Sequence, residues 1–328
     1  MRATARLAAH RQFQGALGAD SHETSTGPSP PDWRHRQSIQ AALCRVSARR
    51  ARDRPYPGPP SHHLVKTTSD AHARQTAVWL MNEAATAADH ATARWLALPV
   101  VAEPPARGFY LARDVDGLAL HRADDARAHP VRCDLAEAVA QRARGVRQSP
   151  LARACGLRRA AGLHVLDSTA GLARDSAALA AAGCTVQMIE RHPVLHALLA
   201  DAHARLDGLE HATSATAWAM RLAPPVHADA AAWLADQPAG DFDVIYMDPM
   251  FESPRRKAKP QKALAWLADL AGHDGDADTL LAAARAAGAG RVVVKQHARA
   301  KPLAPPSHQV EARAVRFDVY LGAPATRT

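Results

Sequence analysis

The chain has 328 residues, of which 47% are hydrophobic and 22% are charged, and its formal net charge is +9. That length and apolar fraction suit a globular protein with one large core or two domains, and no apolar run is long enough to span a membrane. The four cysteines are widely spaced and form no C-x-x-C pair, and no histidine has metal-ligand spacing with a carboxylate. We therefore expect reduced thiols, a cytoplasmic location and no metal.

The positive charge is concentrated in residues 1–75. This segment holds 12 Lys/Arg and 5 Asp/Glu, whereas the rest of the chain, with 29 basic and 27 acidic residues, is almost neutral. Global charge therefore gives no argument that the rest of the chain binds RNA. Proline-rich breakers and the lack of periodicity predict a disordered or loosely attached leader. An organellar transit peptide, or translation that begins at Met81, is the alternative.

Residues 76–150 are predicted to form a small accessory α+β region. Within it, residues 108–122 alternate in polarity around Asp116 and Gly117, which indicates a β-hairpin with a primed turn. The region ends in an arginine-rich stretch without acids that leads into the next predicted strand. Such a stretch suits phosphate contacts beside a pocket, or equally a solvated helix face. Its members are Arg142, Arg144, Arg147, Arg153, Arg158 and Arg159.

The segment LHVLDSTAGLARD, residues 163–175, has the outline of a cofactor site. Its apolar start suits a strand buried on both faces that ends at Asp167. Small residues up to Gly171 let the turn pass close to a ligand, and Arg174 and Asp175 then open a helix. A dinucleotide fingerprint has three glycines and this turn has one, which favours a cofactor without phosphates, such as S-adenosylmethionine, over NAD. An ordinary strand-to-helix turn is the alternative.

The next predicted strand, within CTVQMIERHP, ends at Glu190. A carboxylate at this place, 23 residues after Asp167, can accept hydrogen bonds from both hydroxyls of a ribose. Taken alone, Glu190 is equally well interpreted as a solvated acid at a strand end.

A third apolar strand runs into Asp248, Pro249, Met250 and Phe251, in the segment FDVIYMDPMF. This sequence resembles the D/N-P-P-Y/F loop of methyltransferases that modify exocyclic amines. In that chemistry a carboxylate and a backbone carbonyl accept hydrogen bonds from the target amine, while the aromatic residue stacks on the flipped base. Asp248, Pro249 and Phe251 are therefore the candidate catalytic residues. A tight turn after a strand is the alternative.

A second basic cluster without acids follows this loop directly. It consists of Arg255, Arg256, Lys257, Lys259 and Lys262. Next to an amine-methylation loop, such a cluster favours contacts with RNA phosphates, although a solvated helix would have the same pattern. Lys295, at the end of the apolar segment RVVVK, is a further candidate for a phosphate or base contact, or a solvated lysine.

In chain order, the segments DSTAGLARD, MIERHPVLHALL, VIYMDPMF, RRKAKPQKALAWL, RVVVK and RFDVYLG resemble successive blocks of the RsmJ-type bacterial 16S ribosomal RNA guanine-N2 methyltransferases. The resemblance covers about residues 90–323. It implies a class I S-adenosylmethionine-dependent methyltransferase domain over residues 151–328, an α/β fold with a Rossmann-like seven-stranded sheet. Strands are expected near residues 163, 185, 225, 243 and 291, and a last hairpin within residues 309–321 should insert the only antiparallel strand.

The resemblance also assigns residues to the cofactor pocket. They are Asp167, Gly171, Arg174, Asp175, Glu190, Arg191, Asp229, Ala230 and Asp248, the last of which would border the target base as well. Ser168 and Ala173 stand where the family usually has Ala and Gly. Because both are small, we expect the turn to survive. Ala230 stands where the family has a hydroxyl residue, so only its backbone is expected to contribute.

The implied reaction is methyl transfer from S-adenosylmethionine to the exocyclic amine of a guanosine in 16S ribosomal RNA, in the small subunit or its precursor. Two other classes of function stay open from sequence. One is a related enzyme that methylates a DNA adenine, a protein or a small molecule. The other is an RNA-binding assembly factor without catalysis. An NAD-dependent oxidoreductase is the weakest alternative, because the chain has no conventional pyrophosphate turn.

Overall fold

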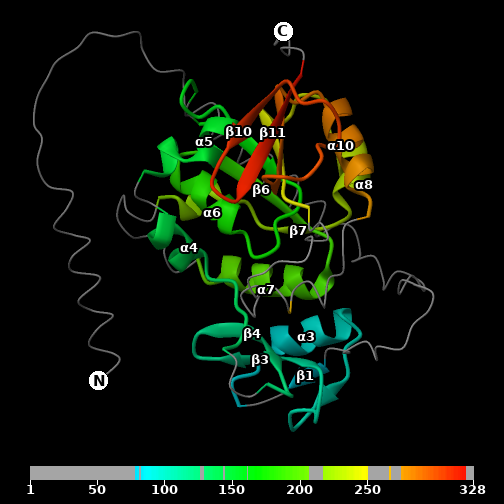
Figure 1. The fold of residues 1–328 in the computed structure, drawn as a ribbon. Coiled ribbons are helices and arrows are strands. Elements are labelled where there is room, and N and C mark those ends of the chain that lie inside the picture. Colours follow the sequence, from blue (N-terminus) through cyan, green and yellow to red (C-terminus); the bar gives the residue numbers. More distant parts are fainter. Residues whose placement is uncertain are drawn as a thin grey trace, which may run out of the picture. The chain divides into compact units, whose positions relative to one another are not determined.

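The computed structural model describes residues 78–80, 83–125, 129–142, 145–160, 162–206, 217–249, 266 and 275–322. The leader, Phe251 and the basic cluster from Arg255 to Lys262 lie outside these residues. Residues 70–328 form one compact unit that contains two β-sheets (Figure 1). A division of this unit into two domains at residue 150 stays a prediction.

The larger sheet has seven strands in the order β10-β11-β9-β8-β5-β6-β7. β11 pairs antiparallel with both of its neighbours, and all other neighbouring pairs are parallel. The seven-stranded sheet with a single inserted antiparallel strand is thus confirmed. The strands are β5 (His164–Asp167), β6 (Thr185–Glu190), β7 (Val226–His227), β8 (Val244–Met247), β9 (Arg291–His297), β10 (His308–Glu311) and β11 (Val315–Leu321).

Helices cover both faces of this sheet, and β8, a central strand, is therefore buried along its whole length. In β8, Val244 and Tyr246 enter one core cluster and Ile245 and Met247 the other, because side chains alternate along a strand. The first cluster includes α5 (Pro150–Ala154), α6 (Arg174–Ala181) and α7 (Pro193–Ala204). The second includes α8 (Ala230–Ala235) and α10 (Ala277–Ala286). Two 3₁₀ turns are η1 (Val146–Gln148) and η4 (Ala219–Arg221).

The smaller sheet has the strand order β2-β1-β3-β4 and precedes the larger one in the chain. Its strands are β1 (Val78–Leu80), β2 (Val100–Val101), β3 (Phe109–Asp114) and β4 (Gly117–Arg122), with the helix α3 (Ala87–Trp95) between β1 and β2. The helix α4 (Leu135–Arg142) follows. β3 and β4 pair antiparallel, which confirms the hairpin predicted over residues 108–122.

The primed turn predicted for this hairpin is wrong. Primed turns need a positive φ at the first central residue. Neither Val115 nor Asp116 has a positive φ, whereas Gly117 has φ 106°. The reason is steric, since the β-branched Val115 disfavours a positive φ and the glycine after the turn adopts it instead. A side chain at Gly117 would also collide, because its Cβ would lie 2.6 Å from Nε of Arg205.

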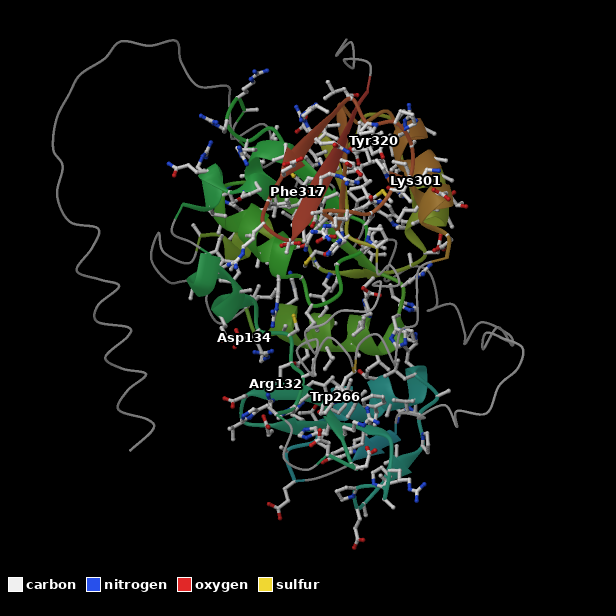
Figure 2. All side chains as sticks on the ribbon, in the orientation of Figure 1. Arg132, Asp134, Trp266, Lys301, Phe317 and Tyr320 are labelled. Carbon is white, nitrogen blue, oxygen red and sulfur yellow. The ribbon has the colours of Figure 1, made fainter. Side chains whose placement is uncertain are left out.

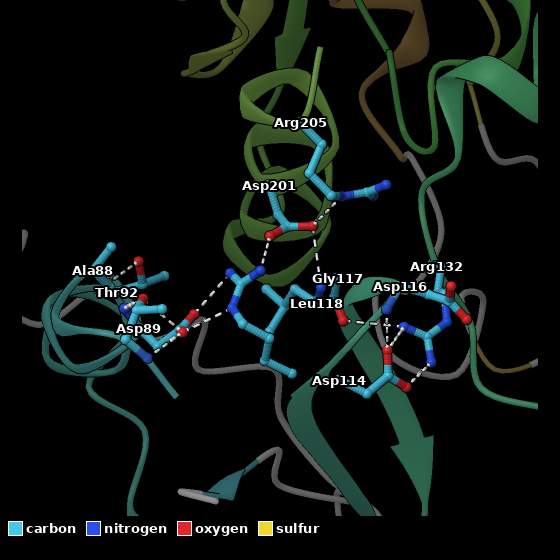
Figure 3. A network of polar contacts seen from close by, with 12 residues as sticks. Ala88, Asp89, Thr92, Asp114, Asp116, Gly117, Leu118, Arg132, Asp201 and Arg205 are labelled. Atoms are coloured by element: carbon cyan, nitrogen blue, oxygen red, sulfur yellow. Dashed lines mark hydrogen bonds and ion pairs between the residues drawn. The ribbon is translucent and has the colours of Figure 1, made fainter. Parts of the chain in front are cut away.

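A buried charge network joins the small sheet to α7 (Figure 3). Arg113 of β3 donates two hydrogen bonds to Asp89 of α3, of 2.8 and 2.9 Å, and lies 2.5 Å from an oxygen of Asp201 in α7. The other Asp201 oxygen accepts from the backbone of Leu118 and from Arg205, both at 3.0 Å. Hydrogen bonding to Asp89, and then to Asp201, raises the pKa of Arg113 although burial opposes it. The guanidinium therefore stays charged between two buried carboxylates.

Replacing Arg113 with Met should lower the free energy of unfolding by about 3–5 kcal/mol, because two buried carboxylates lose their common partner. The side chains of Asp89 and Asp201 are only 3% and 6% exposed. Arg132→Met is the matched control, since its partner Asp114 is 45% exposed and can be solvated; it should cost about 1 kcal/mol or less. Denaturant unfolding of both variants measures this, and equal losses would contradict the assigned role of Arg113.

Candidate active site at the carboxyl edge of the large sheet

Four predicted site residues meet at one edge of the large sheet. Asp167 ends β5, Glu190 ends β6, Asp248 follows β8, and Lys295 lies near the end of β9. Because these strands are parallel neighbours in the order β9-β8-β5-β6, their carboxyl ends lie side by side. This edge is where ligands bind in open α/β sheets.

Glu190 is held by the two turns that follow β5 and β6. One carboxylate oxygen accepts from the backbone N–H of Gly171 at 2.7 Å, and the other accepts from the backbone N–H of His192 at 2.7 Å. The residue is 7% exposed, and a Cβ added at Gly171 would meet no atom within 4 Å. The turn therefore has open space beside it, next to a carboxylate that is fixed by backbone donors on both of its oxygens.

Asp167 fastens the start of α6 to the end of β5. One of its oxygens accepts from the hydroxyl of Ser176 at 2.5 Å, and the other accepts from the backbone N–H of Thr169 at 3.3 Å. Burial raises the pKa of Asp167 to about 7, although the hydrogen bond from Ser176 opposes this. Ser168 is also engaged, since both its backbone N–H and its hydroxyl donate to the carbonyl of Tyr246. Ser168 thus takes part in the turn through hydrogen bonds of its own.

Ala173 keeps the turn as well, but in a strained conformation. It is the N-cap of α6, with φ 52° and ψ 29° in the left-handed region, and it is almost completely buried. A residue with a Cβ is disfavoured there, and glycine is not. The expectation that a small residue suffices is therefore met at the cost of backbone strain.

Lys295 bridges two carboxylates at the centre of the edge. Its ammonium donates to Asp248 at 2.7 Å and to Asp175 at 2.8 Å, and Asp175 also accepts from the hydroxyl of Tyr246 at 2.7 Å. Burial opposes the charge, but Asp248 and Asp175 raise the pKa of Lys295 above its usual value. The backbone N–H of Asp248 donates to the hydroxyl of Thr169 at 2.6 Å. The first residue of the DPMF loop is therefore fixed from both β5 and β9.

The remaining predicted cofactor residues follow the strand ends on the same edge. Arg174 is exposed at the first position of α6, and Ala230 is buried at the first position of α8. Asp229 caps α8 by accepting from the backbone N–H of Ala232 at 2.9 Å. Arg191 forms an ion pair with Asp276 at 2.6 Å. Their contacts with a cofactor stay predictions.

Sequence reasoning missed the side chains that hold these residues in place. The sequence indicates Thr169 only as one of the small turn residues and Tyr246 only as part of an apolar strand, and nothing in the pattern singles out Ser176. Tyr246 is fully buried, and burial followed by the charge of Asp175 raises its pKa well above the usual value, so its hydroxyl stays a donor. The polarity of this tyrosine within an apolar run is the one signal that could have identified it.

Two arginines of the stretch before β5, Arg147 and Arg159, lie away from this edge, whereas Arg144 and the side chain of Arg142 lie outside the described residues. Arg147 donates to the backbone carbonyls of Ala182 and Leu157, at 3.1 and 3.2 Å, and so supports the fold. Arg159 lies close enough to influence Arg291, which begins β9 at the opposite edge of the sheet. The reason is topological, because a segment that leads into a parallel strand reaches its amino end.

Comparison with known proteins identifies the family of this chain. A family model for SAM-dependent methyltransferases matches residues 94–322. The ribosomal RNA small subunit methyltransferase J of Alkalilimnicola ehrlichii is 41% identical over 247 residues, which cover 72% of this chain and 91% of that protein. The same enzyme of Laribacter hongkongensis is 39% identical over 232 residues, covering 69% and 80%. The chain belongs to this methyltransferase J family.

A solved structure supports the same placement. The crystal structure of a SAM-dependent methyltransferase from Neisseria gonorrhoeae is 30% identical, with a TM-score of 0.58, and covers 76% of this chain and 97% of that one. The predicted class I methyltransferase fold is confirmed, and family membership makes S-adenosylmethionine the cofactor. The residues present fit it, because the Glu190 carboxylate at the end of β6 bonds a glycine turn that has open space beside it and only one glycine.

The described residues also bear on the predictions about metal ions, membrane spans and cysteines. Among them, no group of three or more His, Cys, Asp or Glu could hold a metal ion, and no helix is long and apolar enough to cross a membrane. Cys133, Cys155 and Cys184 are buried free thiols, and burial raises the pKa of Cys133 to about 12. A thiol so rarely ionised is a poor nucleophile, so we assign these cysteines to packing.

Replacing Ala173 with Gly should stabilise the protein. Relief of the left-handed strain exceeds the added entropy of the unfolded chain, for a net gain of about 0.5–1 kcal/mol. Thermal unfolding measures the shift. Ala182→Gly serves as the control, since Ala182 has φ −74° and gains nothing from glycine, so it should lower the melting temperature. Equal destabilisation by both changes would contradict the strain.

Replacing Glu190 with Ala should weaken S-adenosylmethionine binding at least tenfold. Each charge-assisted hydrogen bond to the ribose contributes about 1.5–3 kcal/mol. Calorimetry of the folded variant gives the dissociation constant. Glu311→Ala removes another acid at a strand end, from the exposed end of β10, and should leave binding unchanged. An unaltered constant for the Glu190 variant would remove this residue from the site.

Proposed function

We propose that this protein transfers a methyl group from S-adenosylmethionine to the exocyclic amine of a guanosine in small-subunit ribosomal RNA. The resemblance to the RsmJ-type family implies N2 of guanine 1516 in 16S rRNA as the target, and relatives named ribosomal RNA small subunit methyltransferase J support a small-subunit RNA substrate. The observation that carries the proposal is the position of Asp248. It begins an amine-methylation motif, lies beside the strand that carries the cofactor turn, and is fixed by Lys295 and Thr169. Such a substrate belongs to the cytoplasm, as a free precursor or within the subunit.

Positioning supplies most of the catalysis in this proposal. S-adenosylmethionine brings a methyl group that its sulfonium already activates, so a strong base is not required. The lone pair of the guanine amine is delocalised into the ring. The Asp248 carboxylate and the Pro249 carbonyl accept hydrogen bonds from the two amine protons and turn the lone pair toward the methyl group. As the nitrogen becomes positively charged, Asp248 stabilises the charge and holds the proton that is released.

Lys295 acts in this scheme through Asp248. Its ammonium bonds one oxygen of Asp248, and because its pKa is raised it stays charged at neutral pH and holds that carboxylate in a single orientation. The ammonium of Lys295 bonds the two carboxylates of Asp248 and Asp175. A contact of Lys295 with RNA stays a prediction. Lys295 is thus a positioning residue.

Two parts of the proposed RNA site lie outside the described residues. Phe251 is the proposed stacking platform for the flipped base, and stacking of this kind contributes about 1–3 kcal/mol per base. The cluster from Arg255 to Lys262 is the proposed contact with neighbouring phosphates. In the sequence, Phe251 comes two residues after Pro249, and the cluster begins six residues after it.

Replacing Asp248 with Ala should slow methyl transfer to small ribosomal subunits, taken from cells that lack this protein, by about a hundredfold or more. The amine loses its orienting acceptor, and misplacement at the reacting centre has this effect. Asp248→Asn keeps one acceptor oxygen and should retain more activity. Transfer of radiolabelled methyl under single-turnover conditions measures the rate. A wild-type rate for the Ala variant would refute the assigned role of the DPMF loop.

A further inference from the structure

Two loops surround the carboxyl end of β9, next to the proposed active site. One is residues 298–307, between β9 and β10, and the other is the turn of residues 312–314 between β10 and β11. They meet where the backbone N–H of Ala298 donates to the carbonyl of Ala314 at 3.2 Å, beyond the last β9–β11 pair, Val315 with His297. The turn of residues 312–314 and the start of the longer loop therefore lie on the edge that carries Lys295 and Asp248, whereas the longer loop ends at Ser307, whose backbone N–H donates to Val319 toward the other edge.

These loops present three exposed basic side chains: Arg299, Lys301 and Arg313 (Figure 2 labels Lys301). Arg299 follows Ala298 in the chain, and Arg313 precedes Ala314, so the two flank the hydrogen bond that joins the loops. In the part of the chain that the structure describes, none of the three forms an ion pair, and Glu311 is the only exposed acid within the two loops and β10. Their charges are thus available to a partner.

A buried arginine fixes the longer loop. Arg316 of β11 donates to the carbonyls of Ala298 and Ala300, both at 2.9 Å, and to both oxygens of Asp318, at 2.7 and 3.0 Å. It also donates to the side chain of Gln296 at 3.1 Å. Arg316 is 7% exposed and Asp318 is fully buried. Arg299 and Lys301 therefore extend from a backbone that is already ordered, which reduces the entropy lost when they bind a ligand.

We propose that Arg299, Lys301 and Arg313 bind phosphates of the RNA chain that flanks the target guanosine. The inference rests on the proposed function. Three separate cations around one strand end suit a partner that carries evenly spaced charges, and a nucleic acid strand has one per nucleotide. A base held at Asp248 brings its neighbouring nucleotides across this edge. An acidic peptide would have no comparable reason to lie beside a base-sized site.

The test is the salt dependence of RNA binding by a triple variant, Arg299→Gln, Lys301→Gln and Arg313→Gln. Filter binding of the full-length protein to 16S rRNA is measured across salt concentrations. The slope of log affinity against log salt should fall by about 2–3, because each lost phosphate contact removes about 0.7–0.9. Affinity at physiological salt should fall at least tenfold. S-adenosylmethionine binding, measured by calorimetry, should not change and shows that the variant is folded.

The matched control is Arg153→Gln, Arg158→Gln and Arg159→Gln. These three arginines are also exposed, and the loss of charge is the same, but they precede β5 and so lie toward the opposite edge of the sheet. A control slope within about 1 of the wild type supports the surface. Equal reductions in both variants, or none in either, overturn it. Binding needs no methyl transfer, so an inactive wild type would refute the proposed function alone.

Discussion

The site depends on one ionic interaction, the bridge that Lys295 makes between Asp175 and Asp248. Two carboxylates that accept hydrogen bonds from the same ammonium lie close together, and without a cation between them they would repel each other in a partly buried site. The three residues come from α6, from the loop after β8 and from β9. The bridge therefore ties together the helix that follows the cofactor turn and the loop that is proposed to hold the target amine.

The cofactor turn is likewise held by a few specific hydrogen bonds. Glu190 uses the backbone of Gly171 and His192 to orient its carboxylate, and Asp167 uses Ser176 and Thr169 to place the start of α6. The strained Ala173 lies within the same turn. Strain persists where surrounding contacts determine the backbone, and here the buried helix start and the bonded carboxylates do so. The turn is thus rigid before any ligand arrives, which suits a reaction that depends on positioning.

The small sheet is attached to α7 by polar contacts whose two carboxylates are buried. Arg113 lies between Asp89 and Asp201, and Gly117 has no room for a side chain beside Arg205. Such a network specifies one geometry more strictly than apolar packing, because each charge that loses its partner is left in a poor solvent. We infer that the accessory sheet is fixed against α7, the helix that follows the Glu190 turn.

The sequence alone determined the order of the strands, the ends of β5, β6 and β8, and the residue types at those ends, because buried parallel strands are continuous apolar runs and their acidic ends interrupt them. It also identified the family, since the motifs occur in a specific order.

Only the tertiary structure decided which side chains meet. The pairing of Lys295 with Asp175 joins residues 120 positions apart, and the hydroxyl of Tyr246 gains its partner, Asp175, from α6. Arg147 and Arg159, in the stretch that suits phosphate contacts, lie toward the amino edge because they precede β5. Arg299 and Arg313 became neighbours only because β11 reverses direction. The sequence shows which charged residues are close along the chain. It does not show on which edge of the sheet they lie, because that depends on the direction of the strand that each segment precedes or follows.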